Sequence, residues 1–440
     1  MEEERRENNL SNGESGDAPR YRFIIIAVLS LSTFTNFLVL FNLGVLLPAI
    51  SEDMGLSPSE QGWLGSSALI ANLVFSLPFG WWLSRLDAKL VTTIALVAGG
   101  LFLFVQGWAP IFLVLLLGRL LFGLSGIARE PARAMLTQQW IPDREIVMVN
   151  GVLVGVIGVA IAIGFFVTPY ILSRSDDNWR LAFYIFGFMT LAVAVAWQLL
   201  GRERITRSYI QRSVSQAGTP LRGLLRYRQL WWTGMGLFGA NLLWLAFITF
   251  WPTLLLDRYQ VSLALSGALM AVSGIVSSVF ALIVSYLMTR RDIGKAWLFL
   301  CGILITITSI GMSLTGSLPL QFAMSFINGI GWSFFPIVMT VPFKLPGIKP
   351  REVAVAIGFL EMAVWAGGAV GPVFVGMLQE ATDDLQFTLI AASLFGLLLS
   401  LGAVLLPSEA RFKALGLGDG STSFSQASPR PQNPPVPGGD

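Results

Sequence analysis

The chain has 440 residues, of which 54% are hydrophobic and 12% charged, and its net charge is +3. Soluble globular proteins carry about 25% charged residues, so this composition indicates an integral membrane protein. The chain has no histidine and one cysteine, Cys301, which excludes an intrachain disulfide and argues against zinc or redox chemistry. We therefore expect no cofactor and no metal site.

Residues 1–20 are polar and begin with acidic residues, unlike a cleavable signal peptide. Apolar segments of about 20 residues or more follow, and each is long enough to cross a bilayer as a helix. Their continuous apolar runs exclude the alternating strands of a membrane barrel. The twelve predicted spans are approximately 23–48, 61–84, 90–108, 110–129, 147–172, 181–201, 229–254, 262–288, 296–314, 318–341, 354–378 and 385–406.

Basic residues concentrate on one side of these spans. With a cytoplasmic N-terminus, 25 of the 29 Lys and Arg residues fall in cytoplasmic segments, three fall in outside loops, and Arg119 lies within a span. Cytoplasmic loops of membrane proteins carry an excess of basic residues. We therefore expect a multi-pass protein of the cytoplasmic membrane with both termini in the cytoplasm.

The longest connection, residues 202–228, is basic and polar. It predicts a cytoplasmic linker between an N-terminal six-helix bundle at 21–201 and a C-terminal six-helix bundle at 229–406. Residues 407–440 are rich in Gly, Pro and Ser and cannot bury a core, so we expect a disordered cytoplasmic tail.

The two halves repeat each other at a nearly constant offset. An offset of 205 places Asn36 on Asn241 and Gly62 on Gly267, and an offset of 207 places Gly164 on Gly371. Six spans return the chain to the same side of the membrane. The halves are therefore predicted to be parallel repeats about an axis along the membrane normal.

The loops after the second and eighth spans place charged pairs at matching positions: Arg85 with Asp87, and Arg290 with Asp292. Opposite charges at helix ends can join neighbouring spans in one state and release them in another, which makes these residues a candidate cytoplasmic gate. The plain alternative is that the arginines only set the topology.

These features resemble the major facilitator superfamily. The motif from Arg119 to Gly123 resembles the arginine–glycine motif of that family's fourth span, and Trp179-Arg180 resembles the start of its sixth span. Glycine-rich packing motifs recur in the fifth and eleventh spans, at Gly155, Gly158, Gly164, Gly367, Gly368 and Gly371. The resemblance covers about residues 21–407 and implies an all-α fold of two six-helix repeats. The cyanate-permease-like and organic-anion porters are candidate relatives. The loop after the second span departs from the family pattern at Ser84 and Asp87.

Arg119 lies near the middle of its predicted span, where an unpaired cation costs at least about 2.5 kcal/mol. Three roles stay open: it binds an anionic substrate group, it holds a carboxylate that tunes proton coupling, or it is a structural pin to backbone carbonyls. Glu361 is the only acidic residue well inside a predicted span. It is a candidate proton carrier and a candidate partner of Arg119, with a neutral, hydrogen-bonded carboxyl as the alternative.

The resemblance implies a cavity lined by the first, fourth, seventh and tenth spans. Candidate substrate-binding residues there are Arg119, Asn36, Asn241, Trp244, Asn328 and Trp332. Asparagines in hydrocarbon need partners and face inward. For each aromatic residue, ordinary core packing is the competing interpretation.

The sequence predicts a secondary transporter that moves a small organic or inorganic anion by alternating access, driven by a proton or substrate gradient. The alternative is an exporter of hydrophobic or drug-like compounds. An enzyme is not expected because no catalytic set is visible, and a ligand-binding sensor stays open. No phosphate-binding loop for ATP occurs in the chain. The expected partners are a small-molecule substrate, protons and membrane lipid, without nucleic acid, and the expected state is a monomer.

Overall fold

The computed structural model describes residues 18–83, 86–141, 143–204, 227–288, 290, 293–345 and 350–406. Within these ranges all regular secondary structure is helical. The first group of helices comprises α2 (Ala18–Phe41), α3 (Leu43–Met54), α4 (Pro58–Leu83), α5 (Ala88–Trp108), α6 (Phe112–Trp140), α7 (Asp143–Arg174) and α8 (Trp179–Leu200). The second comprises α10 (Arg228–Tyr259), α11 (Leu263–Met288), α12 (Gly294–Leu314), α13 (Leu318–Gly331), α14 (Phe335–Thr340), α15 (Pro350–Thr382), α16 (Leu385–Ser393) and α17 (Leu397–Leu405).

Eleven helical segments of the described chain are long and apolar enough to cross a membrane. Helix α4 occupies the position of the remaining predicted span and packs against α6 and α15. The predicted all-helical membrane fold is therefore confirmed. Most of the predicted N-terminal segment at 1–20, most of the linker at 202–228 and the predicted tail lie outside the described residues.

Several predicted spans have different limits in the structure, and three of them bear on the site. The first span is broken at Asn42, where α2 ends and α3 begins. The Asn42 side chain donates to the Leu38 carbonyl of α2, and asparagine commonly competes with helical hydrogen bonds in this way. In the tenth span the regular helix α13 ends at Gly331, and short helical segments continue the chain to Lys344. Two prolines in these turns, Pro336 and Pro342, lack the N–H that a continuous helix needs.

The fourth span is the most consequential difference. It was predicted to end at residue 129, but α6 continues as a helix to Trp140. Arg129 therefore lies about 4.5 Å from the midpoint of its helix, given a rise of 1.5 Å per residue. The charged residues that follow Arg119 are therefore part of the same continuous helix, as expected.

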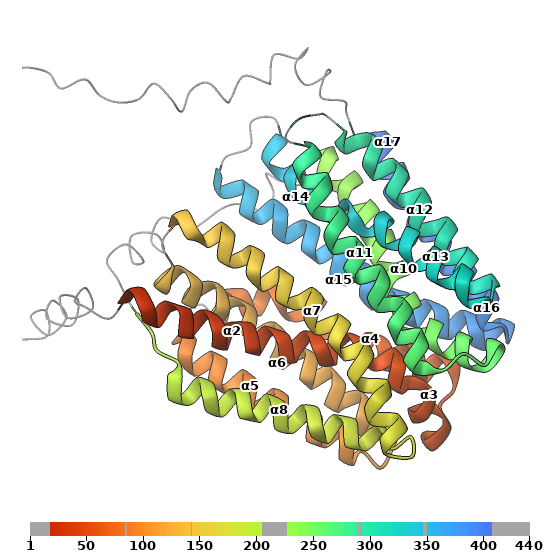
Figure 1. The fold of residues 1–440 in the computed structure, drawn as a ribbon. Coiled ribbons are helices and arrows are strands. Elements are labelled where there is room, and N and C mark those ends of the chain that lie inside the picture. The colour runs from red at the N-terminus through yellow and green to blue at the C-terminus, as the bar shows by residue number, and fades with distance from the viewer. Residues whose placement is uncertain are drawn as a thin grey trace, which may run out of the picture.

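The two groups of helices form two bundles that meet at one end and diverge toward the other (Figure 1). They meet at the closed end, near α3, α4 and α16, and diverge toward the open end, where α2 begins and α14 lies. The contacts between the bundles are made chiefly by α15 with α4, α11 with α7, and α10 with α3.

Small residues allow the close approach at the closed end. A Cβ atom at Gly62 of α4 would lie 2.5 Å from the carbonyl oxygen of Pro372 of α15. A Cβ atom at Gly267 of α11 would lie 2.1 Å from the carbonyl oxygen of Phe165 of α7. Both distances are too short for any side chain, so only glycine permits these backbone contacts. This packing of small residues is typical of helices in membranes.

Glycines of the same helices are free of such contacts toward the open end. No atom of another helix lies within 4 Å of a Cβ built at Gly151 or Gly155 of α7, Gly274 of α11 or Gly358 of α15. The spacing between the bundles therefore increases along these helices from the closed end to the open end.

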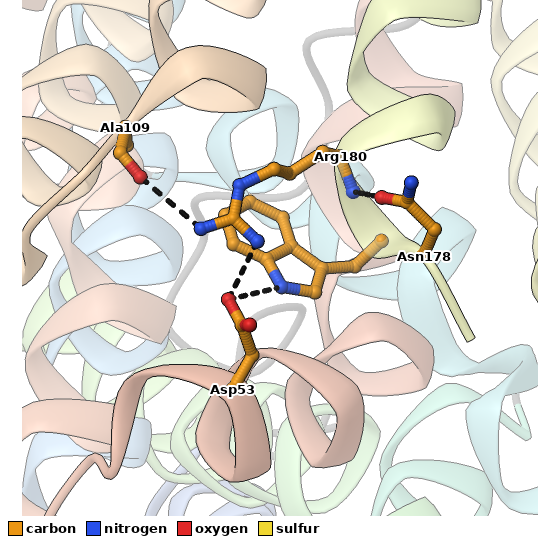
Figure 2. Close-up of polar contacts among 5 residues, drawn as sticks. Asp53, Ala109, Asn178 and Arg180 are labelled. Carbon is orange, nitrogen blue, oxygen red and sulfur yellow. Dashed lines mark hydrogen bonds and ion pairs between the residues drawn. The ribbon is translucent and has the colours of Figure 1, made fainter. Parts of the chain in front are cut away.

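A polar cluster fixes α3 to the rest of the first bundle at the closed end (Figure 2). Asp53 of α3 accepts hydrogen bonds from Arg180 Nη1 at 2.6 Å and from the buried Trp179 Nε1 at 3.2 Å. The Arg180 guanidinium also lies 4.3 Å from the centre of the Trp179 ring. Asn178 accepts a hydrogen bond from the backbone of Arg180 and thereby caps α8. The Trp179-Arg180 motif therefore anchors the second part of the first span.

Candidate functional site

Arg119 is buried between α2, α4 and α6. Its side chain is 1% exposed, its Nε donates to the Leu64 carbonyl at 3.1 Å, and its Nη2 donates to the Leu40 carbonyl at 2.9 Å. Leu40 is next to last in α2, where the break at Asn42 leaves carbonyl groups without helical partners. A cation at a helix C-terminus also interacts favourably with the helix dipole. These contacts agree with the structural-pin alternative, and the substrate role of Arg119 stays a prediction.

A second arginine of the same helix, Arg129, is buried with a different set of partners. Its Nη2 donates to the Asn36 side-chain oxygen at 2.8 Å, its Nη1 to the Ser32 carbonyl at 3.2 Å, and its Nε to the Ser125 carbonyl at 3.4 Å. The side chain is 5% exposed. All three acceptors are neutral, so these hydrogen bonds orient the guanidinium, and the opposite charge that acts on it is that of the neighbouring Glu130.

The backbone of α6 is shaped for this contact. A Cβ atom at Gly126 would lie 2.7 Å from the side-chain oxygen of Asn36. Glycine at this position therefore lets the Asn36 side chain lie against α6, where it accepts the hydrogen bond from Arg129. Asn36, a predicted substrate-binding residue, is placed in the site as the residue that orients this arginine.

One turn further along α6, Glu130 and Arg133 form an ion pair. Arg133 Nε donates to Glu130 Oε2 at 3.1 Å, and both side chains are partly exposed. Glu361 of α15, in the other bundle, has an exposed side chain and interacts electrostatically with both Glu130 and Arg133. Glu361, the predicted coupling residue, thus interacts with charged residues of α6. These residues are Glu130 and Arg133, and not the predicted partner Arg119.

These residues surround a small pocket within the first bundle. Its lining comes from α2, α5 and α6 and comprises Leu29, Ser32, Thr33, Asn36, Thr92, Gly126, Arg129, Glu130 and Arg133. The pocket contains two arginines and one glutamate, which sum to a net charge of +1 with all three ionised. Such a pocket attracts a small anion.

Arg129, Glu130 and Arg133 are not selected as site residues from the sequence because they are placed at the cytoplasmic end of the helix that contains Arg119, where a charge costs little. A signal was present: the two arginines are four residues apart and therefore share a face of a continuous helix. Gly123, Gly126 and Pro131 lie among these residues, yet α6 continues as a helix through all three. Extending the helix by its pattern would have placed Arg129 and Arg133 on the same helix face.

The second bundle contributes a polar network around Asn328 of α13. Its Nδ2 donates to the hydroxyl groups of Thr308 at 2.8 Å and Ser309 at 3.3 Å. Its Oδ1 accepts from Ser273 at 3.1 Å and from the indole N–H of Trp332 at 3.0 Å. An amide side chain has two donor hydrogens and two acceptor lone pairs, so this network uses the full capacity of Asn328.

The predicted residues Trp244 and Trp332 belong to a row of aromatic rings. The ring centres of Trp332 and Trp244 are 6.1 Å apart, and those of Trp244 and Phe41 are 4.8 Å apart. Phe41 lies at the end of α2, so the row crosses from the second bundle to the first. Asn241 is buried one turn before Trp244 and donates to the Leu237 carbonyl of its own helix at 2.9 Å.

The predicted gate residues are only partly described. Asp87 is exposed and directly precedes α5, and Arg290 is exposed with its guanidinium 4.9 Å from the centre of the Tyr286 ring. Arg85 and Asp292 lie outside the described residues. The gate role of these four residues stays a prediction.

Two helical bundles that span a membrane, with charged groups buried among the helices, form the architecture of a membrane transporter. The chain belongs to the Major Facilitator Superfamily, whose family model matches residues 29–372. It is therefore a multi-pass membrane transporter and not an enzyme.

The chain is also similar to individual transporters along most of its length. The chain is 25% identical to the probable sulfoacetate transporter SauU of Cupriavidus necator over 85% of this chain and 91% of the relative. It is 22% identical to the hexuronate transporter of Bacillus subtilis over 86% of this chain and 93% of the relative. Among solved structures, a bacterial homologue of the lysosomal transporter Spinster, in an inward-facing and occupied conformation, superposes with a TM-score of 0.70. That match has 18% identity and covers 88% of this chain and 95% of the other.

Proposed function

We propose that the chain is a secondary active transporter of a small organic anion and that the acid group binds beside Arg129 and Arg133. The burial of Arg129 among neutral acceptors carries this proposal. A charge held this way costs free energy, which a bound anion offsets. The forked guanidinium also matches the geometry of a carboxylate or sulfonate. We assign Arg119, which lies outside the pocket lining, to the structural role.

The names of the two relatives support an organic acid as the substrate. Sulfoacetate carries a sulfonate and a carboxylate, whereas a hexuronate carries one carboxylate. The relatives therefore agree on a small organic anion and differ in the number of its acid groups. The alternative function, export of hydrophobic compounds, has no comparable support, because the pocket of the first bundle carries charged side chains.

The packing between the bundles supports transport by alternating access. The closed end is held by backbone contacts at Gly62 and Gly267, whereas Gly151 and Gly358 have open space around them. With both termini in the cytoplasm, the open end faces the cytoplasm and this conformation faces inward. Rocking of the two bundles would bring the free glycines into contact and separate the closed end.

The charges around the pocket support coupling to protons through Glu361. With Glu361 ionised, the charges of Arg129, Glu130, Arg133 and Glu361 sum to zero. Protonation of Glu361 leaves a net charge of +1 and favours an incoming anion. A proton and an anion would then bind together, which is the requirement for symport.

Counterflow in reconstituted vesicles tests the proposed function. Galactonate, a hydroxylated six-carbon acid with one carboxylate, serves as the test substrate. Vesicles that contain the wild-type protein and are loaded with unlabelled galactonate should transiently accumulate labelled galactonate. Arg129→Gln should abolish accumulation, whereas Arg180→Gln, which removes an arginine at the closed end, should retain it. The proposal fails if no organic acid supports counterflow or if Arg129→Gln transports as the wild type does.

A further inference from the structure

The two bundles present different chemistry to a substrate. With an offset of 206, which places Gly123 on Gly329, Arg129 corresponds to Phe335 and Arg133 to Met339. The arginines of α6 therefore have no charged counterparts at the repeat-related positions of the second bundle. At these two positions, a substrate lying between the bundles would meet arginine only on the side of the first bundle.

The polar groups near Trp332 are not available to a substrate. All four hydrogen-bonding sites of Asn328 are used by Ser273, Thr308, Ser309 and Trp332. The indole N–H of Trp332 is used in the same network, which fixes the orientation of its ring. Trp332 can therefore offer a substrate only its ring surface.

Trp244 presents its ring in the same way. Within residues 241–250 of α10 it is the one residue that is not fully buried. Its ring is tilted by 52° against that of Trp332 and by 51° against that of Phe41, so neither ring stacks flat on its face. The nearby amide of Asn241 donates to its own helix and not toward the ring.

The aromatic row and the arginine pocket lie at different depths. Phe41 follows Asn36 by five residues of α2, which corresponds to about 7.5 Å along the helix. Asn36 holds Arg129, and Phe41 contacts Trp244. A substrate whose acid group binds beside Arg129 would therefore extend its other end toward the aromatic row.

We propose that the substrate carries a single acid group and that Trp244 and Trp332 bind its uncharged end through their ring faces, with Asn328 as the positioning residue for Trp332. This inference rests on the proposed function. Ring faces carry negative electrostatic potential and repel a second carboxylate, but they pack well against the C–H groups of a hydroxylated chain. A second carboxylate without a donor would also lose its hydration without compensation.

Binding of two matched acids tests this proposal on the purified full-length protein. Galactonate and galactarate share a six-carbon hydroxylated chain, and galactarate has a carboxylate at both ends. The wild type should bind galactonate at least about tenfold more tightly than galactarate. Trp244→Leu should weaken galactonate binding about tenfold, and Trp244→Phe, which keeps a ring, should weaken it less.

Glycolate is an acid too short to reach the aromatic row from Arg129. Its binding therefore distinguishes a failure of this inference from a failure of the proposed function. Its affinity should fall in Arg129→Gln and stay unchanged in Trp244→Leu and Asn328→Leu, whereas galactonate binding should fall in all three. Equal affinity for galactonate and galactarate, or an equal loss of glycolate and galactonate binding in Trp244→Leu, would overturn the inference. If Arg129→Gln binds glycolate as the wild type does, the proposed function fails as well.

Discussion

The side-chain oxygen of Asn36 accepts a hydrogen bond of 2.8 Å from Arg129 Nη2, and this contact joins α2 to α6 inside the pocket. Asn36 supplies no charge, so it orients the guanidinium without neutralising it. The repeat-related Asn241 has no such partner and donates to its own helix. The arginine-orienting contact is therefore found in the first half of the duplicated scaffold and not at the repeat-related asparagine.

Arg119→Gln should destabilise the protein without changing its affinity for acids. The substitution removes charge-assisted hydrogen bonds to the Leu40 and Leu64 carbonyls, each worth about 1.5–3 kcal/mol. Thermal unfolding in detergent should show a melting temperature several degrees lower. The folded fraction should bind galactonate with the affinity of the wild type. Lost binding at an unchanged melting temperature would make Arg119 a substrate residue.

Gly62→Val should shift the protein away from the conformation of this structure, because even a Cβ atom at this position meets the Pro372 carbonyl. A cysteine introduced as Gly151→Cys, with Cys301 replaced by alanine, reports on the open end. Its labelling by a membrane-impermeant maleimide should decrease in the Gly62→Val variant.

Gly274→Val is the matched control on a neighbouring helix, since this structure has open space around Gly274. Labelling at Gly151→Cys should stay the same or increase, because the added side chain hinders closure of the open end. If both valines reduced labelling equally, the proposed motion between the bundles would be wrong.

Glu361→Gln should uncouple transport from protons. The side chain would keep its size and lose its charge, so the charge balance with Glu130 and Arg133 would no longer change with pH. Uptake of galactonate into vesicles, measured with and without an inward proton gradient, should respond to the gradient in the wild type and not in the variant. Counterflow, which needs no gradient, should persist. A variant that still responded to the gradient would exclude Glu361 as the proton carrier.

The fold could be predicted from the sequence because span length, basic-residue bias and the internal repeat depend on residue type alone. The positions at which the helices are interrupted are harder to predict from the sequence. Asn42 ends α2 through a side-chain bond to Leu38 and contact with Gly164, and the latter contact comes from a helix more than a hundred residues away. Nothing local to Asn42 distinguishes it from Asn36, which stays within the helix.

The structure places several predicted site residues near one another, and the difference in the limit of the fourth span has a physical cause. A hydropathy scale treats every charged residue as solvent-exposed, so the predicted span ends at Arg129. In the structure, a buried charge can instead be satisfied by carbonyl and amide oxygens of neighbouring helices. The expectation that a polar residue is buried, in contrast, does not show whether its hydrogen-bonding groups bind a substrate or are already paired within the protein. Asn328 is predicted as a substrate residue, but its hydrogen bonds to Ser273, Thr308, Ser309 and Trp332 use all its hydrogen-bonding capacity.

The affinity of Asn36→Asp for galactonate at neutral pH tests whether Arg129 binds the acid group of the substrate. The substitution keeps the shape of the side chain and places a carboxylate against Arg129, where it would compete with the substrate. We expect galactonate binding to weaken at least about tenfold, in line with the cost of lost contacts to a buried charge. The repeat-related Asn241→Asp should change it little. Equal affinities in the wild type and Asn36→Asp would contradict binding at Arg129.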